Sequence, residues 1–285
     1  MTYEKKIESA INLIRSIPQD GPIELCYSGG KDSDVILELA KMSGVPVVPI
    51  YKQTSIDPPG TTAHVKEMGV EIRRPKETFF KLIERRGNPS RFKRFCCEHL
   101  KEYKIYDRAI VGIRRCESTK RMERYKEPEQ CRIYPNGSKT RQYFPILEWT
   151  NEDIDRFIKE RGIRCAPVYY DSEGNFHVER RLGCIGCPLQ GDNGLSDYKK
   201  YPKFLVAQIK AYQKWLDNHK NSSFYRKIEG SAYNAFFYFL FCQSYEEYEM
   251  LTGGGGNCLI VKELYRKSSC RNSFALNLQT ISFNH

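Results

Sequence analysis

The residues whose chemistry is clearest form a short glycine-rich segment near the N-terminus. It reads Ser28-Gly29-Gly30-Lys31-Asp32-Ser33. The apolar residues 23–27 before it are typical of a buried strand, and residues 34–40 after it have the spacing of an amphipathic helix. Two glycines let the backbone turn tightly and approach a ligand closely. Because the free N–H groups and the positive dipole end of the helix then point outward, we expect the segment to bind phosphate.

The side chains of the same segment add charge and hydrogen bonds. Ser28 and Ser33 can donate hydroxyl groups, and Lys31 adds a positive charge. The carboxylate of Asp32 could hold Mg²⁺. The segment is too short for a Walker P-loop and lacks its Lys-Ser/Thr ending. The alternative interpretation is an ordinary glycine-rich turn with a serine cap.

Strand-like and helix-like segments alternate through the first half of the chain. Strands are expected at 23–27, 45–51, 70–72 and 109–113, and helices at 3–16, 33–43, 61–68, 79–85 and 151–161. This order predicts an α/β fold with a mainly parallel twisted sheet flanked by helices. Ligands bind such sheets at the carboxyl ends of the strands. We expect residues 1–194 to form the nucleotide-binding domain and the aromatic-rich residues 195–285 to be helical.

Composition and hydropathy indicate a protein of the cytoplasm. The chain has 285 residues, 40% of them hydrophobic, and a mean hydropathy of −0.60. The N-terminal residues do not resemble a signal peptide, and the apolar run 235–242 is too short to span a bilayer. Eleven cysteines in such a context argue against a disulfide framework and for metal ligands, reactive thiols or buried thiols.

Positive charge is concentrated in one part of the chain. The net charge is +11, and residues 71–126 contain 18 Lys and Arg against 8 Asp and Glu, so this stretch alone carries +10. Such a stretch suits nucleotide phosphates, sulfate or a nucleic-acid backbone. Solvated helix faces with a few substrate-binding arginines are the alternative.

Two pairs of cysteines have spacings that suggest a metal site. Cys96 and Cys97 are adjacent, and Cys184 and Cys187 form a Cys-x-x-Cys knuckle. Adjacent cysteines are unusual for zinc, whose pairs are normally two to four residues apart. They are more compatible with a [4Fe-4S] cluster, in which each thiolate binds a different iron. We therefore expect these four residues to hold a cluster, with zinc or buried thiols as alternatives.

Five further segments resemble one family. They are Cys96-Cys97-Glu98-His99-Leu100-Lys101, Gly183-Cys184-Ile185-Gly186-Cys187-Pro188, residues 53–61, residues 112–118 and residues 144–150. Together with the glycine-rich segment they resemble the phosphoadenylyl-sulfate (PAPS) reductase family of the PP-loop ATP pyrophosphatase superfamily. The cysteine pairs resemble its iron–sulfur branch, near the adenylyl-sulfate reductases and the enzymes of DNA phosphorothioation and tRNA thiolation. The resemblance covers about residues 20 to 192.

The resemblance implies roles for single residues. The segment from Ser28 to Ser33 would hold the phosphates of ATP, adenylyl sulfate or PAPS, with Mg²⁺ bridging them. Thr54 would lie close to the nucleotide. Lys31, Asp32 and Arg114 would be the catalytic residues. The arginines that would contact phosphate or sulfate are Arg114, Arg115 and Arg121. Surface salt bridging is the alternative for Arg115 and Arg121.

The sequence also departs from this family. The C-terminal segment that carries the nucleophilic cysteine of the reductases is absent, and Cys270 is the only cysteine after Lys267. Gln53 and Gly60 replace acidic residues of the family pattern. We therefore expect an enzyme that cleaves the α–β bond of ATP in a sulfur-transfer reaction. A sulfonucleotide reductase releasing sulfite, or a non-catalytic nucleotide-binding module, is the alternative.

Expected partners follow from the same features. They are a nucleotide substrate, a nucleic-acid acceptor bound by residues 71–126, and a sulfur-donor or partner protein. The aromatic C-terminal helices could form a homodimer interface or cap the domain. No membrane partner is expected.

Overall fold

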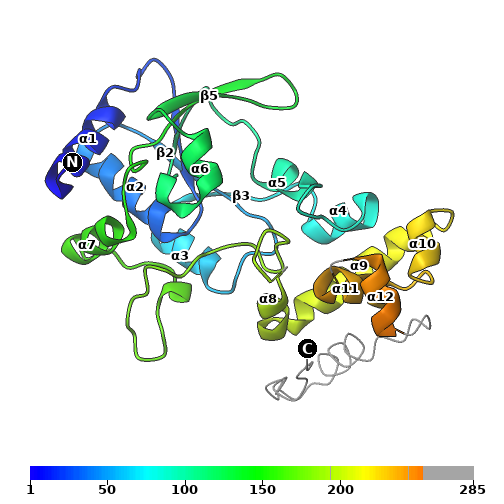
Figure 1. Cartoon of the computed structure of the whole chain (residues 1–285). Coiled ribbons are helices and arrows are strands. Elements are labelled where there is room, and N and C mark those ends of the chain that lie inside the picture. Colours follow the sequence, from blue (N-terminus) through cyan, green and yellow to red (C-terminus); the bar gives the residue numbers. More distant parts are fainter. Residues whose placement is uncertain (193, 243, 253–285) are drawn as a thin grey trace. The chain divides into compact units, whose positions relative to one another are not determined.

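The computed structural model describes residues 1–192, 194–242 and 244–252, with the side chains of 250–252 left out. The chain divides into two compact units (Figure 1). Each of the two units is discontinuous in sequence.

The α/β unit consists of residues 1–76 and 97–183. The helical unit consists of residues 77–96 and of the chain from Cys184 onward. We expected a single boundary after residue 194. In the structure the helical unit also contains an earlier segment, and its second segment begins at Cys184 rather than after residue 194.

Six strands of the α/β unit form one sheet in the order β3-β2-β1-β4-β6-β5. Their bounds are β1 Ile23–Tyr27, β2 Val48–Lys52, β3 Glu71–Arg73, β4 Arg108–Val111, β5 Glu129–Ile133 and β6 Lys139–Tyr143. Strands β1, β2, β3, β4 and β6 are parallel to one another, and the edge strand β5 pairs with β6 in antiparallel. The predicted mainly parallel sheet is confirmed, whereas the β5–β6 hairpin at its edge was not predicted.

Four helices of this unit lie close to their predicted positions: α1 Tyr3–Arg15, α2 Lys31–Ser43, α3 Thr61–Glu67 and α7 Asn151–Arg161. The sequence did not predict α6 Thr119–Arg124 or α5 Phe95–Leu100, whose last four residues belong to this unit. The 3₁₀ turn η1 Arg115–Glu117 directly precedes α6, and the 3₁₀ turn η2 Pro167–Tyr169 follows α7. A capping box at Thr150 starts α7 at the residue expected from the sequence.

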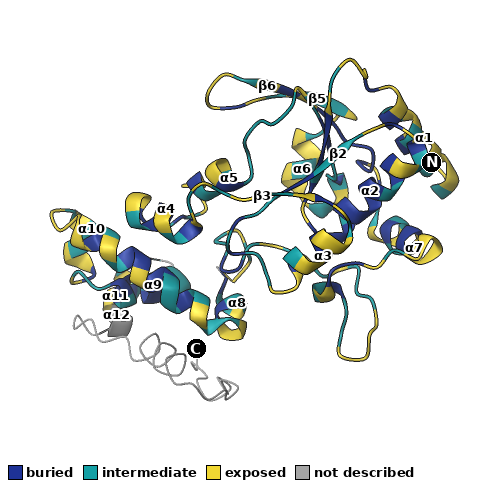
Figure 2. Cartoon of the chain, turned by 180° about the vertical axis from the view of Figure 1, so that it is seen from behind, coloured by how far each residue is buried: buried dark blue, intermediate teal, exposed yellow. Residues whose placement is uncertain are grey.

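Helix α2 is the structural support of the glycine-rich segment. It packs against β1, α1 and α7, so that most of its residues are buried, including Val35, Ile36 and Leu39 (Figure 2). A helix buried on most sides is apolar around much of its circumference. Gly44, in the left-handed conformation, ends the helix.

The helical unit contains α4 Phe79–Arg86, α8 Leu195–Lys200, α9 Pro202–Asp217, α10 Ser223–Lys227, α11 Ala232–Phe241 and α12 Tyr245–Thr252. Helices α4, α8 and α11 all pack against α9. Aromatic rings fill these contacts, as where Tyr212 stacks on Trp215 and meets Phe236 edge-on. The aromatic-rich helices were predicted, and their packing gives this unit its own core.

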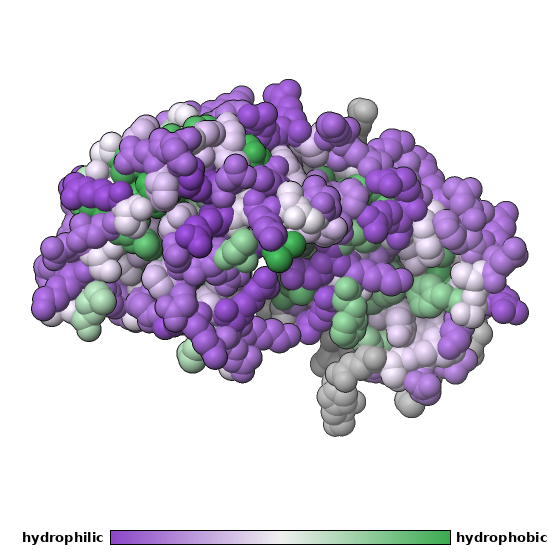
Figure 3. All heavy atoms as spheres, turned by 90° about the horizontal axis from the view of Figure 1, so that it is seen from above, coloured by the Kyte–Doolittle hydropathy of each residue, from purple (hydrophilic) through white to green (hydrophobic). Residues whose placement is uncertain are grey.

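Figure 3 shows one face of the molecule on which hydrophilic side chains dominate and apolar residues occur in small patches. Within the residues that the structure describes, no helix is both long and apolar enough to cross a membrane. The apolar run at 235–242 falls mainly in α11, which has ten residues and several buried side chains.

Candidate functional site

The glycine-rich segment joins the end of β1 to the start of α2, as predicted. Gly29 has a φ of +76°, and a Cβ atom there would lie 2.9 Å from Thr61 Cγ2. Gly30 is the N-cap of α2, and its carbonyl accepts the N–H of Ser33 at 2.8 Å. The chain can therefore make this turn only with glycine at position 29. The Ser33 N–H is used within the turn, so the first turn of α2 offers a ligand the N–H groups that precede Ser33.

The two serines of the segment differ in role. Ser33 is buried and donates to the carbonyl of Gly30 at 2.6 Å, so its hydroxyl mainly holds the turn. Ser28 is exposed, donates to Ser33 Oγ at 3.2 Å and accepts the N–H of Gly30 at 3.3 Å. Ser28 is therefore the better placed of the two to contact a ligand.

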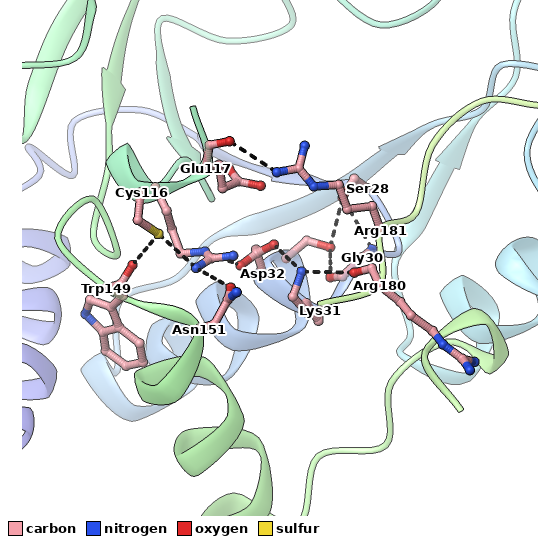
Figure 4. A network of polar contacts seen from close by, with 12 residues as sticks. Ser28, Gly30, Lys31, Asp32, Cys116, Glu117, Trp149, Asn151, Arg180 and Arg181 are labelled. Atoms are coloured by element: carbon pink, nitrogen blue, oxygen red, sulfur yellow. Dashed lines mark hydrogen bonds and ion pairs between the residues drawn. The ribbon is translucent and has the colours of Figure 1, made fainter. Parts of the chain in front are cut away.

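A row of charges runs from the segment to the loop after β4 (Figure 4). Lys31 Nζ lies 3.3 Å from Asp32 Oδ2, and Arg114 Nε donates to Asp32 Oδ1 at 2.7 Å. The side chains of Lys31 and Arg114 are 4% and 2% exposed, and that of Asp32 is 18% exposed. Burial lowers the pKa of Lys31, and the neighbouring Asp32 carboxylate opposes this shift. One carboxylate thus holds two nearly buried cations in fixed positions.

These residues border a cavity of about 490 Å³ inside the α/β unit. Its lining includes Ser28, Gly30, Lys31, Asp32, Ser33, Arg121 and Arg181. The remaining walls come from β1, β2, β4 and the segment around Tyr169 and Leu182. A cavity of this volume with polar groups on one side is typical of a small-molecule site.

The other predicted site residues lie elsewhere in the unit. Gly29 forms the turn but does not line the cavity, and Thr54 is buried and donates to Asp57 Oδ1 at 2.8 Å. Arg114 reaches the site only through Asp32. Arg115 points its Nε to the carbonyl of Tyr125 at 2.6 Å and pairs with Glu148, so it braces a loop. For Arg115 the structure shows the salt-bridging alternative.

Arg121 does line the cavity, from helix α6. Its guanidinium pairs with Glu117, and burial lowers its pKa. Arg181 also lines the cavity, and its Nη2 donates to the carbonyl of Glu117 at 3.2 Å. Sequence reasoning missed Arg181, although it directly precedes the Leu182-Gly183-Cys184 segment at the start of the cysteine knuckle.

A buried polar network supports the glycine-rich segment from behind. His64 Nε2 lies 2.9 Å from Asp34 Oδ1 and 3.0 Å from the Tyr27 hydroxyl, which itself donates to Asp34 Oδ1. Burial raises the pKa of Asp34. Tyr27 precedes the segment and Asp34 follows it, so the network ties both of its ends to α3. This network was also missed, because His64 is distant in sequence.

A second buried pair lies in the cavity wall. Lys52 Nζ is 2.8 Å from Glu24 Oε1, and Lys52 also donates to the carbonyl of Tyr103. The thiol of Cys26 donates to Glu24 at 3.3 Å. This pair gives one wall of the cavity fixed polar groups that the sequence did not reveal.

The Cys-x-x-Cys knuckle is a tight turn of the helical unit. The N–H of Cys187 donates to the carbonyl of Cys184 at 3.3 Å, and Gly186 between them has a φ of +68°. The N–H of Gly186 donates to Asp197 at 3.0 Å, and a Cβ at Gly186 would lie 2.3 Å from the Tyr198 hydroxyl. The turn is therefore held by α8.

Across residues 1–192, 194–242 and 244–252, no group of three or more His, Cys, Asp or Glu side chains is arranged to hold a metal ion. This includes the predicted set of Cys96, Cys97, Cys184 and Cys187. Cys270 lies outside the described residues.

Many charges of the basic stretch are paired within the chain. Ion pairs join eight of its Lys and Arg side chains to acidic partners: Arg73, Lys81, Arg85, Lys104, Arg108, Arg114, Arg115 and Arg121. Pairing of this kind lowers the field that the stretch presents to a polyanion. Exposed cations such as Lys120, Arg124 and Lys139 remain on the α/β unit.

The family model of the phosphoadenosine phosphosulfate reductase domain matches residues 22–190. The chain belongs to this family. The matched region contains the glycine-rich segment, both cysteine pairs and the whole sheet. The iron–sulfur branch of the family is a finer assignment that the match does not make.

Curated relatives include subunits of sulfate adenylyltransferase and of GMP synthase. Subunit 2 of sulfate adenylyltransferase from Brucella anthropi is 26% identical over 211 residues, 60% of this chain and 67% of that protein. One of the subunits of the glutamine-hydrolysing GMP synthase from Archaeoglobus fulgidus is 33% identical over 122 residues, 37% of this chain. The match spans only 40% of that relative's length.

Solved structures give weaker likenesses. PAPS reductase from Candida auris aligns with a TM-score of 0.44 and 16% identity, over 61% of this chain and 93% of that one. FMN adenylyltransferase from Candida glabrata aligns with a TM-score of 0.43 and 17% identity, over 65% and 62%. At TM-scores below 0.5 these likenesses say nothing about activity.

Proposed function

We propose that the α/β unit binds ATP in the 490 Å³ cavity and cleaves its α–β bond, transferring the adenylyl group in a sulfur-related reaction. The observation that carries this proposal is the row of Lys31, Asp32 and Arg114 beside the N-terminus of α2. Negative charge develops on pyrophosphate as the bond breaks, and preorganised cations stabilise it without reorganisation.

The residues of the cavity would divide the work. Backbone N–H groups at the start of α2 and the Lys31 ammonium would bind phosphate oxygens. Arg121, on α6, and Arg181, directly before Leu182, would approach the same phosphates. Asp32 would keep Lys31 and Arg114 in place.

Asp32 is also the residue that fits Mg²⁺. Its Oδ2 receives only the 3.3 Å contact from Lys31, whereas Oδ1 is bound tightly by Arg114. Mg²⁺ takes most of its ligands from phosphates and water, so one carboxylate oxygen is enough from the protein. When bound, the ion would neutralise charge on the departing pyrophosphate.

Product analysis tests the reaction. The protein is incubated anaerobically with Mg²⁺ and either ATP or adenylyl sulfate, and AMP, pyrophosphate and sulfite are measured. The proposal predicts equal amounts of AMP and pyrophosphate from ATP, with water as a slow acceptor. Sulfite from adenylyl sulfate in the presence of a thiol, with no turnover of ATP, would overturn it in favour of a reductase. Binding without any product would indicate a nucleotide-binding module.

We also retain the four-cysteine site as part of the proposal. Its support is the resemblance of the two cysteine pairs to the iron–sulfur branch of the family, and a Cys-x-x-Cys turn that α8 holds in place. Iron and acid-labile sulfide are measured on anaerobically purified wild type, Cys184→Ser and the control Cys131→Ser. The proposal predicts iron and sulfide in wild type and in the control only. A protein without iron would contradict it.

The acceptor is proposed to be a nucleic acid or a small molecule supplied by a partner protein. Lys120, Arg124 and Lys139 are exposed cations that suit a phosphate backbone. If a nucleic acid binds here, its affinity falls steeply with salt and Lys120→Ala reduces the slope. A salt-independent affinity would exclude this acceptor.

Homodimer formation is tested by light scattering of the same samples.

A further inference from the structure

A second cavity of about 370 Å³ lies beside the nucleotide cavity in the α/β unit. The two cavities share Lys31, Glu117 and Arg181. Asp32 lines the first cavity and Arg114 lines the second, so the ion-paired row forms the wall between them. A molecule in the second cavity would therefore lie next to the phosphate-binding groups of the first.

The wall of the second cavity contains a thiol with a fixed position. Arg114 Nη1 donates to Cys116 Sγ at 3.2 Å and to Asn151 Oδ1 at 3.0 Å. Cys116 itself donates to the carbonyl of Trp149 at 3.3 Å, and Figure 4 shows its sulfur between Trp149 and Asn151. Cys116 is exposed, although Arg114 beside it is 1% exposed. The buried guanidinium therefore fixes the position of the sulfur at the wall of the second cavity.

The charges of the lining indicate the class of ligand. Lys31 and Arg181 contribute positive charge, whereas Glu152 and Glu179 contribute negative charge. Glu152 stands at the start of α7, and its pKa is lowered by its hydrogen bond with Thr150, so it is ionised at neutral pH. A cavity with both signs of charge matches a ligand that carries both an ammonium and a carboxylate group.

We propose that the second cavity binds a small zwitterionic sulfur compound, an amino-acid disulfide or persulfide, and that Cys116 exchanges sulfur with it. Sulfur exchange at Cys116 does not require ATP cleavage. Only the use of this sulfur in the reaction at the first cavity rests on the proposed function.

The exchange balances without a further reactant. The Cys116 thiol gives its proton to solvent, and its sulfur attacks the outer sulfur of the ligand's S–S bond. A new S–S bond forms to Cys116 as the old one breaks. The leaving sulfur takes the bonding pair as a thiolate and is protonated by solvent. A disulfide ligand leaves Cys116 as a mixed disulfide, and a persulfide ligand leaves it as a persulfide.

Cys131 is a matched control, because it is a second exposed thiol of the same unit and lies in neither cavity. The wild-type protein is treated with limiting cystine, and modification of both residues is followed by peptide mass spectrometry. A parallel reaction uses bis(2-hydroxyethyl) disulfide, which lacks charged groups. We expect cystine to modify Cys116 about tenfold faster than Cys131, and the uncharged disulfide to show little preference.

Charge variants test the class of ligand. Glu152→Gln should reduce the cystine preference severalfold, whereas Glu160→Gln, on the same helix but outside the cavity, should leave it unchanged. Equal rates at Cys116 and Cys131, or the same preference with both disulfides, would overturn the proposal. Since these reactions contain no nucleotide, their failure and a failure of ATP cleavage are separate results.

Discussion

Arg114 and Asp32 are 82 residues apart in sequence and joined by a 2.7 Å ion pair at the edge of the cavity of about 490 Å³. The pair connects the loop after β4 to the first turn of α2, which follows the end of β1. Because Lys31 approaches the other oxygen of Asp32, removing this carboxylate leaves two cations with uncompensated charge. Breaking a buried pair by deleting one partner costs about 3–5 kcal/mol, and partial exposure of Asp32 reduces that cost.

Asp32→Asn should therefore abolish turnover and also lower stability. Asn keeps the shape but loses the charge that positions Lys31 and Arg114, so we expect the rate of AMP formation to fall about a hundredfold or more. Thermal unfolding should show a Tm lower than that of wild type. Asp155→Asn, on the surface of α7, is the control. An active Asp32→Asn protein would contradict the role given to this carboxylate.

Two neighbouring arginines should give opposite results. Arg121 lines the cavity, and Arg121→Ala should weaken ATP binding about tenfold, because a charge-assisted hydrogen bond contributes ~1.5–3 kcal/mol. Arg115 contacts the carbonyls of Tyr125 and Lys126 and lies outside the cavity. Arg115→Ala should therefore lower the Tm and leave the Kd of ATP within about twofold. A raised Kd of ATP in Arg115→Ala together with an unchanged Kd in Arg121→Ala would contradict these two assignments.

Two glycines with similar backbone angles provide a test of the turn. Gly29 and Gly137 both have positive φ, +76° and +78°. A Cβ at Gly29 would meet Thr61 at 2.9 Å, whereas one at Gly137 would meet nothing within 4 Å. Gly137→Ala should cost about 1 kcal/mol from the backbone alone. Gly29→Ala should cost more in chemical denaturation and should abolish ATP binding. Equal losses of unfolding free energy in the two variants would show that the backbone at residue 29 adjusts to a Cβ atom.

ATP binding should depend on pH through Lys31. Burial lowers the pKa of Lys31 from its ordinary value of 10.5, so the lysine loses its proton at a lower pH than an exposed one. The protonated lysine binds phosphate, so ATP affinity should decrease as the pH rises toward the ordinary lysine pKa of 10.5. Lys31→Arg should retain affinity over the same range, since guanidinium stays protonated. A wild-type affinity that is constant up to the ordinary lysine pKa would contradict this.

The same shift has a defined effect on stability. In the folded protein the lowered pKa means that Lys31 binds fewer protons than in the unfolded chain, over the interval between the two pKa values. Stability therefore rises with pH through that interval. The rise should be absent in Lys31→Gln when unfolding by urea is followed at several pH values.

The sheet and the glycine-rich segment were predictable because their signals are local. Apolar runs at 23–27 and 45–51 and the helical spacing of 151–161 lie within single elements, and these elements form close to where they were expected. The β5–β6 hairpin was missed because its strands are half polar. Its turn contains Asn136-Gly137, which is the strongest short-range signal for a hairpin.

The side-chain contacts that the sequence did not predict join residues that are distant in sequence. Arg114, Arg115 and Arg121 are close neighbours in the chain, but the 3₁₀ turn η1 and helix α6 direct them to Asp32, to Glu148 and to the cavity. Likewise, residues 77–96 join the helical unit because α4 packs against α9. The spacing of residues along the sequence does not show which partner each arginine contacts or which unit a segment joins.

Calorimetric titration of ATP into the wild-type protein and into Lys31→Ala tests the central claim most directly. The account predicts a single site in the wild type and a loss of about tenfold or more in affinity in the variant, because Lys31 is the nearly buried cation of the cavity. Lys120→Ala, an exposed lysine outside the cavity, should bind as the wild type does. Unchanged affinity in Lys31→Ala, or no binding of ATP by the wild type, would contradict it.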